Sequence, residues 1–256
     1  MTTELSTHGF AMLKNAIRID ELEIIRQDLI VIGKTLSGKS YHSIDDYWNY
    51  FRRHDRVAGG AFYNAFKYLP SVHKLAVSSG IIRLLKGPGF LSIPSLIDIN
   101  CRIDSKGEEK YLFGWHQDYW FSVCSTQALV AWIPLMDVDP GMGGLDIISN
   151  KHTNGKIFKT KPGHEYNSYA DAVLLDDDIP VASSISISDQ CKAGDLVLFR
   201  FNVLHRSKPL LSDLRSRFTI QLRYADCLDR EFRMNNFKPG AVNSEKVDFL
   251  TMADHK

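Results

Sequence analysis

The sequence predicts a mainly β protein with flanking helices: a double-stranded β-helix, or jelly roll, of the cupin-like type, with an α-helical N-terminal third packed on one sheet. Apolar residues recur at helical spacing before the turn Gly87-Pro88-Gly89, and about eight short β-type stretches follow it. A chain of 256 residues that is 44% hydrophobic can bury one large core. We therefore expect a single domain over 1–256, with a helical support region over about 1–89, a jelly-roll core over about 90–228 and a C-terminal extension over 229–256.

The N-terminal third contains the predicted helices. Residues 8–18 are expected to form a short strand and a turn. Asp20 suits the start of a helix and Gly33 its end, and the apolar residues between them recur at helical spacing: Leu22, Ile25, Leu29 and Ile32. Further helices are expected between Ser43 and Ser79, with breaks at Gly59-Gly60 and at Pro70. The many aromatic residues of this region are interpreted as core, with a substrate-pocket wall as the alternative.

Turn sequences such as Ala193-Gly194-Asp195 separate several of the predicted strands. The strands are expected at Ser95–Ile103, Lys110–Phe121, Ala128–Val138, Leu145–Ser149, Val181–Ser188, Leu196–Phe201, Val203–Ser207 and Phe218–Ala225. Residues 150–180 are predicted to form a long loop, of a length typical of functional lids. The tail after Asp229 is predicted to lie extended over the surface.

Composition and charge exclude several classes of function. Lys and Arg number 31 against 30 Asp and Glu, a net charge of +1, which argues against partners such as nucleic acid or an acidic membrane surface. No stretch approaches the roughly 18 apolar residues of a membrane span, and the N-terminus lacks a targeting pattern. The four cysteines form no CxxC pair, which favours reduced thiols over a zinc ribbon or a disulfide framework. We expect a cytoplasmic protein that acts on a small-molecule substrate.

The run from Phe113 to Trp120 carries the strongest chemical signal. On a β-strand, residues two apart point to the same face, so His116 and Asp118 would converge on one spot. An imidazole and a carboxylate are two of the three ligands in the 2-His-1-carboxylate set that holds non-heme Fe(II). The third must come from another strand, and His205, which follows the apolar strand Leu196–Phe201, is the best candidate.

Iron held by these groups keeps open positions that suit a chelating 2-oxo acid and then O2. The distal carboxylate of such an acid is recognised best by a buried arginine, which can bind it with two hydrogen bonds. The last predicted strand places a polar set on one face: Arg217, Thr219, Gln221 and Arg223. Periodicity alone leaves two alternatives open, in which this face either lines a wet cavity or points to solvent.

The chain resembles the phytanoyl-CoA dioxygenase family of Fe(II)/2-oxoglutarate oxygenases from about residue 8 to residue 225. The resemblance rests on an ordered set of motifs: His8-Gly9-Phe10-Ala11-Met12-Leu13, Trp115-His116-Gln117-Asp118, Ala131-Trp132-Ile133-Pro134, Gly143-Gly144-Leu145, His205-Arg206-Ser207 and Arg217. The chain departs from the family at Arg206, where the family often has Gly, and at Ser149-Asn150-Lys151-His152, where the family often has Gly-Ser-His. A bare HxD motif is common by chance, whereas the ordered set is specific.

The resemblance implies a role for each motif residue. His116, Asp118 and His205 would be the iron ligands, and Arg217 with Ser207 would bind the distal carboxylate of 2-oxoglutarate. Trp132 would lie beside the co-substrate, with plain barrel core as its alternative. Arg215 is the alternative to Arg217, and the polar residue expected on the preceding strand is either Asn100 or Arg102. The family's related halogenases lack the carboxylate ligand, so Asp118 argues against that chemistry.

We therefore expect an Fe(II)- and 2-oxoglutarate-dependent dioxygenase that uses O2, hydroxylates an unactivated C–H bond and releases succinate and CO2. Two alternatives stay open. One is a non-catalytic jelly-roll module in which the histidines are structural and the cavity holds a ligand. The other is a cupin-like metalloenzyme that uses no 2-oxo acid. The substrate itself is not predicted by the sequence.

Overall fold

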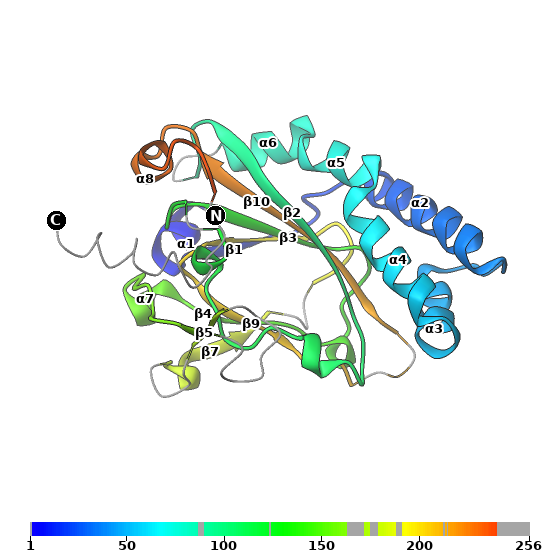
Figure 1. Ribbon diagram of the computed structural model, residues 1–256. Helices are drawn as coiled ribbons and strands as arrows, with labels where there is room; N and C mark the ends of the chain where they lie inside the picture. The colour runs from blue at the N-terminus through cyan, green and yellow to red at the C-terminus, as the bar shows by residue number, and fades with distance from the viewer. Residues whose placement is uncertain are drawn as a thin grey trace.

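The computed structural model of the chain describes residues 2–86, 90–122, 124–162, 172–174, 179–187, 191–211, 213 and 215–239 and shows a mixture of helices and antiparallel sheets (Figure 1). Its helices are α1 (Thr2–His8), α2 (Ile19–Ser37), α3 (Ile44–His54), α4 (Arg56–Tyr68), α5 (Pro70–Ala76), α6 (Ser79–Leu85), α7 (Asn150–Thr153) and α8 (Arg230–Met234). Its strands are β1 (Phe10–Leu13), β2 (Pro94–Asp104), β3 (Leu129–Pro134), β4 (Gly144–Ile148), β5 (Lys161–Pro162), β6 (Ala172–Val173), β7 (Ser184–Ser186), β8 (Leu196–Arg200), β9 (Leu204–Lys208) and β10 (Arg217–Asp226).

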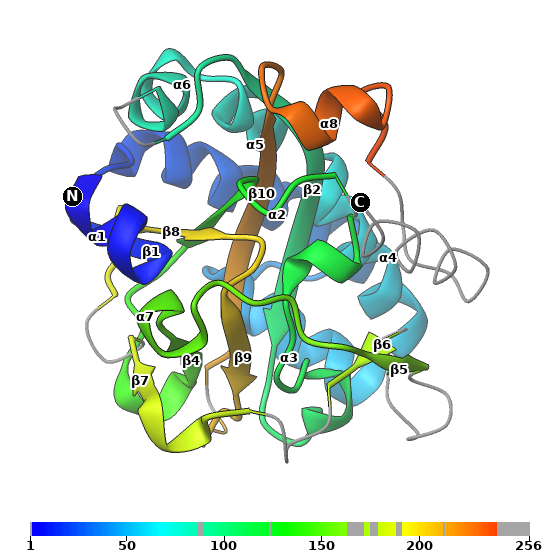
Figure 2. The ribbon, with the colours of Figure 1, turned by 90° about the vertical axis from the view of Figure 1, so that its left-hand side faces the viewer.

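The described strands form three antiparallel sheets, of five, three and two strands. Five strands pair in the order β1-β8-β3-β10-β2, three pair in the order β7-β4-β9, and β5 pairs with β6. In Figure 1 the helices α2 to α5 lie on one side of the five-stranded sheet, and β4, β7 and β9 lie on its other side. Figure 2, turned by 90°, shows β10 and β2 side by side along the length of the molecule. The interior between the two sheets is therefore the place where side chains from both can meet.

Strand β10 determines what faces that interior. Its apolar residues point toward the helices, where the Phe218 ring lies 6.3 Å from the Phe66 ring and the Tyr224 hydroxyl donates to the carbonyl of Ala76 at 2.6 Å. Because side chains alternate along a strand, the polar residues point the other way, into the interior. Gln221 and Arg223 line a cavity there. Of the two alternatives for the polar face, the wet cavity is the one observed.

Three glycines of the N-terminal third do not behave as the sequence suggested. Helix α2 continues past Gly33 to Ser37 and ends at Gly38, whose φ of 64° is left-handed. Gly33 is instead a packing residue, since a Cβ there would lie 2.5 Å from the Tyr47 ring. Gly59-Gly60 do not break a helix either but lie inside α4. The break before α4 comes at Asp55, which accepts a hydrogen bond from Ala58 N as its cap.

The prediction of a strand over Lys110–Phe121 is also wrong. This segment holds the 3-10 turns Glu109–Tyr111 and Asp118–Trp120, and its only described pairing is the single bridge between His116 and His205. The other predicted strands agree with β2, β3, β4, β7, β8, β9 and β10 to within a few residues. The tail begins with helix α8 rather than an extended segment, and residues 240–256 lie outside the described part. In the predicted loop 150–180, α7, β5 and β6 are described, while 163–171 and 175–178 are not.

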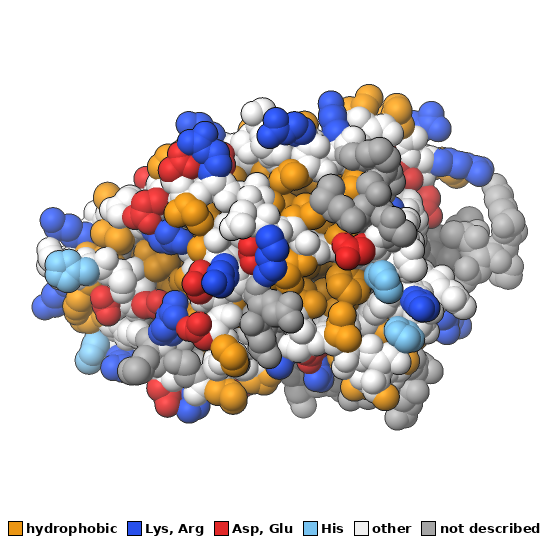
Figure 3. Space-filling view, turned by 180° about the vertical axis from the view of Figure 1, so that it is seen from behind, with side chains coloured by type: hydrophobic (Ala, Val, Ile, Leu, Met, Phe, Trp, Pro, Cys, Tyr) orange, Lys and Arg blue, Asp and Glu red, His pale blue; other side chains and the backbone are white. Residues whose placement is uncertain are grey.

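The distribution of charge on the surface and the state of the cysteines agree with what the composition led us to expect. On the face shown in Figure 3, basic and acidic side chains are interspersed among hydrophobic ones. All four cysteines are free, and Cys101, Cys124 and Cys191 are buried. Within the described residues, none of the helices combines the length and the apolar character that a bilayer crossing requires.

Candidate metal centre

His116, Asp118 and His205 converge in the interior between the sheets. Each offers a ligand atom, and these atoms lie within 4.8 Å of one another. The His116 and His205 rings are 4.1 Å apart between centroids, and His205 Nε2 lies 3.5 Å from Asp118 Oδ2. Two imidazoles and one carboxylate at this separation form the donor set that binds non-heme Fe(II) on one face. The structure therefore brings together the three residues that the sequence singled out, although the strand alternation invoked for them is not the cause.

A bridge and a turn bring the trio together. The backbone N–H of His116 donates to His205 O at 3.0 Å and the N–H of His205 donates back to His116 O at 3.0 Å. This pair fixes the two histidines side by side, one from β9 and one from the preceding segment. The chain then enters the 3-10 turn at Asp118, which is 1% exposed and points its carboxylate at the same spot.

Backbone carbonyls hold both imidazoles in the orientation that a metal needs. The ring Nδ1 of His116 lies 2.8 Å from Gly114 O, and that of His205 lies 3.0 Å from Val203 O. A carbonyl oxygen can only accept, so each Nδ1 carries the proton and donates it. The lone pair is then on Nε2 of each ring, which is the atom left to face a metal ion.

A buried arginine neutralises the carboxylate. Arg223 donates to Asp118 Oδ1 from Nε at 3.2 Å and from Nη2 at 2.8 Å, and its Nη1 donates to Asp98 at 3.1 Å. Arg223 comes from the polar face of β10 and is 7% exposed. It therefore leaves one oxygen of Asp118, Oδ2, directed toward the histidines.

The protonation states suit cation binding at neutral pH. Burial, together with the neighbouring His205, lowers the pKa of His116 to about 3, and burial also lowers the pKa of His205. Burial alone would raise the pKa of Asp118, but Arg223 and the two imidazoles outweigh it and bring that pKa to about 2. Near pH 7 the site thus presents two neutral imidazoles and one carboxylate, which are the deprotonated forms that metals bind.

A cavity of about 180 Å³ opens beside the trio. Ser207 and Trp132, both expected near a co-substrate, line it. Asn100 and Arg102 also line it, so both candidates on the preceding strand face the same space. Arg217 is not among the lining residues and is only 1% exposed.

Arg217 lies at the inner end of the same polar face, held by three acceptors. It donates to Asp104 at 2.8 Å and to the carbonyls of Met142 and Gly144 at 3.1 and 3.3 Å. Its Nε, however, is buried without a hydrogen-bond partner among the described residues, and so is the hydroxyl of Thr219 two positions along. Buried polar groups are rarely left unpaired. The two orphaned atoms are therefore places where a ligand could bind.

Two residues of the site were not singled out from the sequence. Arg223 belonged to the recognised polar face, and its period-two spacing from Arg217 was the available signal. Gln117 gave no such signal. Its amide donates to the carbonyls of Asn202 and Lys156 at 2.6 and 2.8 Å, and its oxygen accepts from Phe158 N at 2.8 Å. Gln117 thereby fastens the backbone between the two ligand positions to the start of the predicted loop.

Comparisons with known proteins found a matching family model and solved structures with a similar fold. The family model described as phytanoyl-CoA dioxygenase (PhyH) matches residues 5–218. Among solved structures, the epimerase SnoN in complex with Fe3+, alpha ketoglutarate and nogalamycin RO is 16% identical, with a TM-score of 0.59 over 88% of this chain and 82% of that chain. HygX from Streptomyces hygroscopicus with nickel and 2-oxoglutarate bound is 14% identical, with a TM-score of 0.54 over 90% and 86%.

EctD from S. alaskensis in its apoform is a further similar structure, 15% identical with a TM-score of 0.58 over 90% of this chain and 79% of that chain. No curated protein sequence matches the chain. At these identities the solved structures establish a shared fold, and the family model establishes the lineage.

Proposed function

The chain belongs to the phytanoyl-CoA dioxygenase family, and from this premise we propose that it is an Fe(II)- and 2-oxoglutarate-dependent oxygenase that hydroxylates a small molecule. The observation that carries the proposal is the convergence of His116, Asp118 and His205. In the overall reaction, one oxygen atom of O2 enters the substrate C–H bond and the other enters succinate, while 2-oxoglutarate loses CO2. Electrons balance, because oxidative decarboxylation and hydroxylation each supply two electrons to O2.

The trio fits Fe(II) by its donor chemistry. His116 and His205 would each supply Nε2, and Asp118 would supply Oδ2, since Oδ1 is occupied by Arg223. Three ligands on one face leave the remaining positions of an octahedral ion for the co-substrate and O2. Bound iron would supply the oxygen activation, and the protein would supply binding and orientation.

The polar face of β10 fits 2-oxoglutarate. We assign Arg217 and Ser207 to its distal carboxylate and Trp132 to its flank, with the orphaned Thr219 hydroxyl as a further donor. The charges support this assignment, because buried Asp104 faces two guanidinium groups, those of Arg102 and Arg217. One carboxylate against two cations leaves a positive charge that a second carboxylate would neutralise, and a buried charge is tolerated only when paired.

The proposal extends to the architecture of the chain. We take the five-stranded and three-stranded sheets as the two faces of a double-stranded β-helix, or jelly roll, with the metal centre between them. The whole chain, 1–256, would be one domain. In it, residues 1–89 would support the core formed by 90–228, and 229–256 would extend from it.

The experiment that tests the proposal compares two neighbouring arginines. Titration calorimetry under anaerobic conditions would measure 2-oxoglutarate binding to the Fe(II)-loaded chain, to Arg217→Ala and to Arg215→Ala. We expect about a 10- to 100-fold loss for Arg217→Ala, since a hydrogen bond to a charged group contributes about 1.5–3 kcal/mol. Arg215→Ala is the control, because the Arg215 side chain is 41% exposed and pairs with Asp139. Equal affinities in both variants would remove Arg217 from its role.

Two further measurements separate the proposed enzyme from its alternatives. Metal analysis of the purified chain should find one Fe(II) bound, and the loaded chain should release succinate from 2-oxoglutarate under O2. A chain that binds no metal would support the ligand-binding module instead. Metal binding without any dependence on 2-oxoglutarate would support the cupin-like enzyme.

A further inference from the structure

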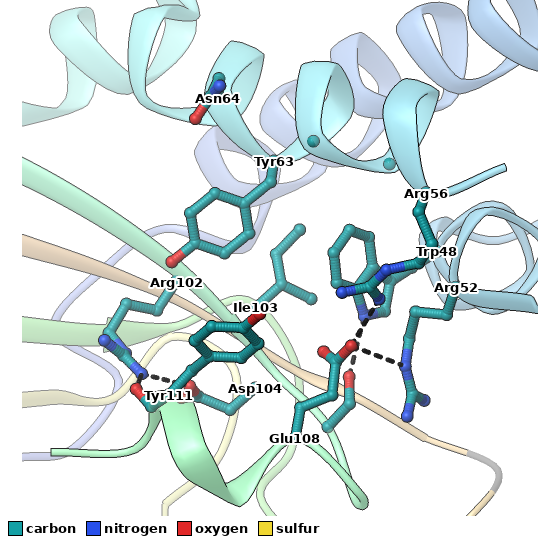
Figure 4. A pocket seen from close by; sticks show the side chains of 13 residues that line it. Trp48, Arg52, Arg56, Tyr63, Asn64, Arg102, Ile103, Asp104, Glu108 and Tyr111 are labelled. Atoms are coloured by element: carbon teal, nitrogen blue, oxygen red, sulfur yellow. Dashed lines mark hydrogen bonds and ion pairs between the residues drawn. The ribbon is translucent and has the colours of Figure 1, made fainter. Parts of the chain in front are cut away.

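A second cavity borders the interior of the two sheets and shares Arg102 with the cavity beside the metal trio. It holds about 210 Å³ and is bounded by α3, α4 and the C-terminal end of β2 (Figure 4). Its lining residues include neither His116, Asp118 nor His205. Apart from Arg102 and Asp104, the residues of this cavity have no part in the metal centre or its co-substrate site.

Gly60 lies on the wall of this cavity, and no packing contact explains why a glycine occupies the position. Helix α4 has two consecutive glycines in its interior, where glycine is unfavourable by about 1 kcal/mol relative to alanine. Gly59 has a packing reason, since a Cβ there would lie 3.1 Å from Phe51 Cβ. A Cβ on Gly60 would meet nothing within 4 Å, yet Gly60 lines the cavity. A bare helix surface beside a cavity lets a ligand approach the backbone closely.

The two ends of the cavity carry guanidinium groups. At one end Arg102 donates to Asp104 at 2.7 Å and to the carbonyl of Tyr111 at 2.8 Å. At the other end Arg52 and Arg56 converge on Glu108, as Figure 4 shows. Arg102 also lines the cavity beside the metal trio, and Asp104 is shared with Arg217, so the positive charge at that end is the one assigned to the co-substrate. At the other end two guanidinium groups face the single carboxylate of Glu108, which leaves room in the charge balance for one further carboxylate.

The middle of the cavity is aromatic and apolar. In Figure 4 the rings of Tyr63 and Tyr111 lie between the two charged ends, with Ile103 beside Tyr111 and Trp48 behind Arg56. A flat apolar body can pack against such rings, and a carboxylate on it can bind a guanidinium with two hydrogen bonds. The volume limits the size of the ligand, because drug-sized molecules occupy about 300–1,000 Å³. The cavity suits a fragment-sized molecule and is too small for a nucleotide or a coenzyme A group.

We propose that this cavity is a binding site for a small monocarboxylate with a flat apolar body, separate from the metal centre. The carboxylate binds at the end where Arg52 and Arg56 converge, and the apolar body lies against Tyr63 and Tyr111. Gly60 keeps the helix side of the cavity open. The site stands whether or not the chain is an oxygenase, since Arg52, Arg56 and Tyr63 do not line the cavity beside the metal trio.

Benzoate is the probe that tests this site, with the full chain free of metal and 2-oxoglutarate. Ligand-observed NMR and calorimetry would measure its binding to the unchanged chain, to Gly60→Leu and to Gly80→Leu. Leucine at 60 would project from α4 at the cavity. Leucine at 80 is the matched control, since Gly80 is also helical, lies in α6 and has its nearest neighbour, Ser78 Oγ, at 3.8 Å. Benzyl alcohol, of similar shape but uncharged, tests the need for the carboxylate.

We expect benzoate to bind the unchanged chain and Gly80→Leu alike, and Gly60→Leu at least about tenfold more weakly. Benzyl alcohol should bind at least about tenfold more weakly than benzoate, because it lacks the charge-assisted hydrogen bonds. Absence of benzoate binding, or equal binding by the two leucine variants, would overturn the site. Equal binding of benzyl alcohol would overturn the assignment of its ligand as a carboxylate. Failure of 2-oxoglutarate to bind would count against the proposed oxygenase alone.

Discussion

Arg223 donates two hydrogen bonds to the same oxygen of Asp118, Oδ1, and leaves Oδ2 facing His205. The guanidinium thus provides a counter-charge for the buried carboxylate before any metal binds. It also fixes which oxygen is presented, because a carboxylate held on one side cannot rotate to offer both. One-oxygen ligation would leave more positions open on a bound ion than two-oxygen ligation.

Replacing Arg223 with Met should destabilise the metal-free chain strongly. The change leaves the Asp118 carboxylate buried without its main counter-charge, and breaking a buried pair in this way costs about 3–5 kcal/mol in the free energy of unfolding. Arg206→Met is the control, because Arg206 pairs with Asp146 while its side chain is 40% exposed. That variant should lose no more than about 1 kcal/mol. Urea unfolding would measure both, and similar losses would show that Arg223 is not the critical partner of Asp118.

The acid sensitivity of the chain should depend in part on Asp104. Burial would raise the pKa of Asp104, but Arg102 and Arg217 outweigh it and hold that pKa below its usual range. A carboxyl with a lowered folded-state pKa contributes stability above its ordinary pKa of about 3.9, and this stability is lost as the pH falls through the lower value. Asp104→Asn should therefore be much less stable than the unchanged chain near pH 7, with a difference that shrinks in acid. Urea unfolding at about pH 7, 5 and 3 would measure it.

Asp213→Asn is the control for that series, since the Asp213 side chain is 73% exposed and pairs with Lys106. Its stability should follow that of the unchanged chain at every pH. A constant difference between Asp104→Asn and the unchanged chain would contradict the proposed titration.

Thr219→Val should stabilise the free chain and weaken 2-oxoglutarate binding. The Thr219 hydroxyl is buried without a described partner, and an unsatisfied buried polar group costs about 1–3 kcal/mol. Valine has nearly the same shape and no hydroxyl. The lost donor should lower co-substrate affinity by a factor of about 2–10, the equivalent of one ordinary hydrogen bond.

Thr153→Val provides the matched control, because the Thr153 hydroxyl is likewise buried without a described partner but lies in α7. It should raise the melting temperature without changing 2-oxoglutarate affinity. If Thr219→Val also leaves that affinity unchanged, the orphaned hydroxyl has no part in the co-substrate site.

Adjacent glycines in α4 should differ in their response to alanine, with the larger gain in stability at Gly60. Gly60→Ala should raise the free energy of unfolding by about 0.5–1 kcal/mol, since alanine favours the helix and its Cβ meets nothing within 4 Å. At Gly59 the same gain is opposed by a Cβ contact of 3.1 Å with Phe51. Thermal unfolding of the two variants would compare them directly. A lower melting temperature for Gly60→Ala would show that this glycine has a structural role after all.

Residue type and spacing were enough to single out His116, Asp118 and His205 and to divide β10 into a polar and an apolar face, but they left open which face points inward. The sequence did not predict the backbone between residues 110 and 121, where one bridge to His205 and a 3-10 turn replace a strand. That bridge is a tertiary contact, which local pattern does not reveal. The same holds for Arg217, whose pairing with Asp104 follows from the register of β10 against β2. The different roles of Gly33 and Gly60 depend on which side chains surround them in the fold, and the sequence does not show this.

The alternation along β10 joins folding and chemistry in one strand. Its even positions from Phe218 to Tyr224 pack toward the helices, whereas its odd positions from Arg217 to Arg223 face the centre. A slip of one residue would exchange the two sets and place rings at the iron and cations against the helices. Insertions within β10 should therefore be eliminated during evolution. If every position of β10 is substituted in turn, the type of defect should alternate along the strand. Substitutions at even positions should prevent the folded protein from accumulating, whereas those at odd positions should give folded protein without catalytic activity.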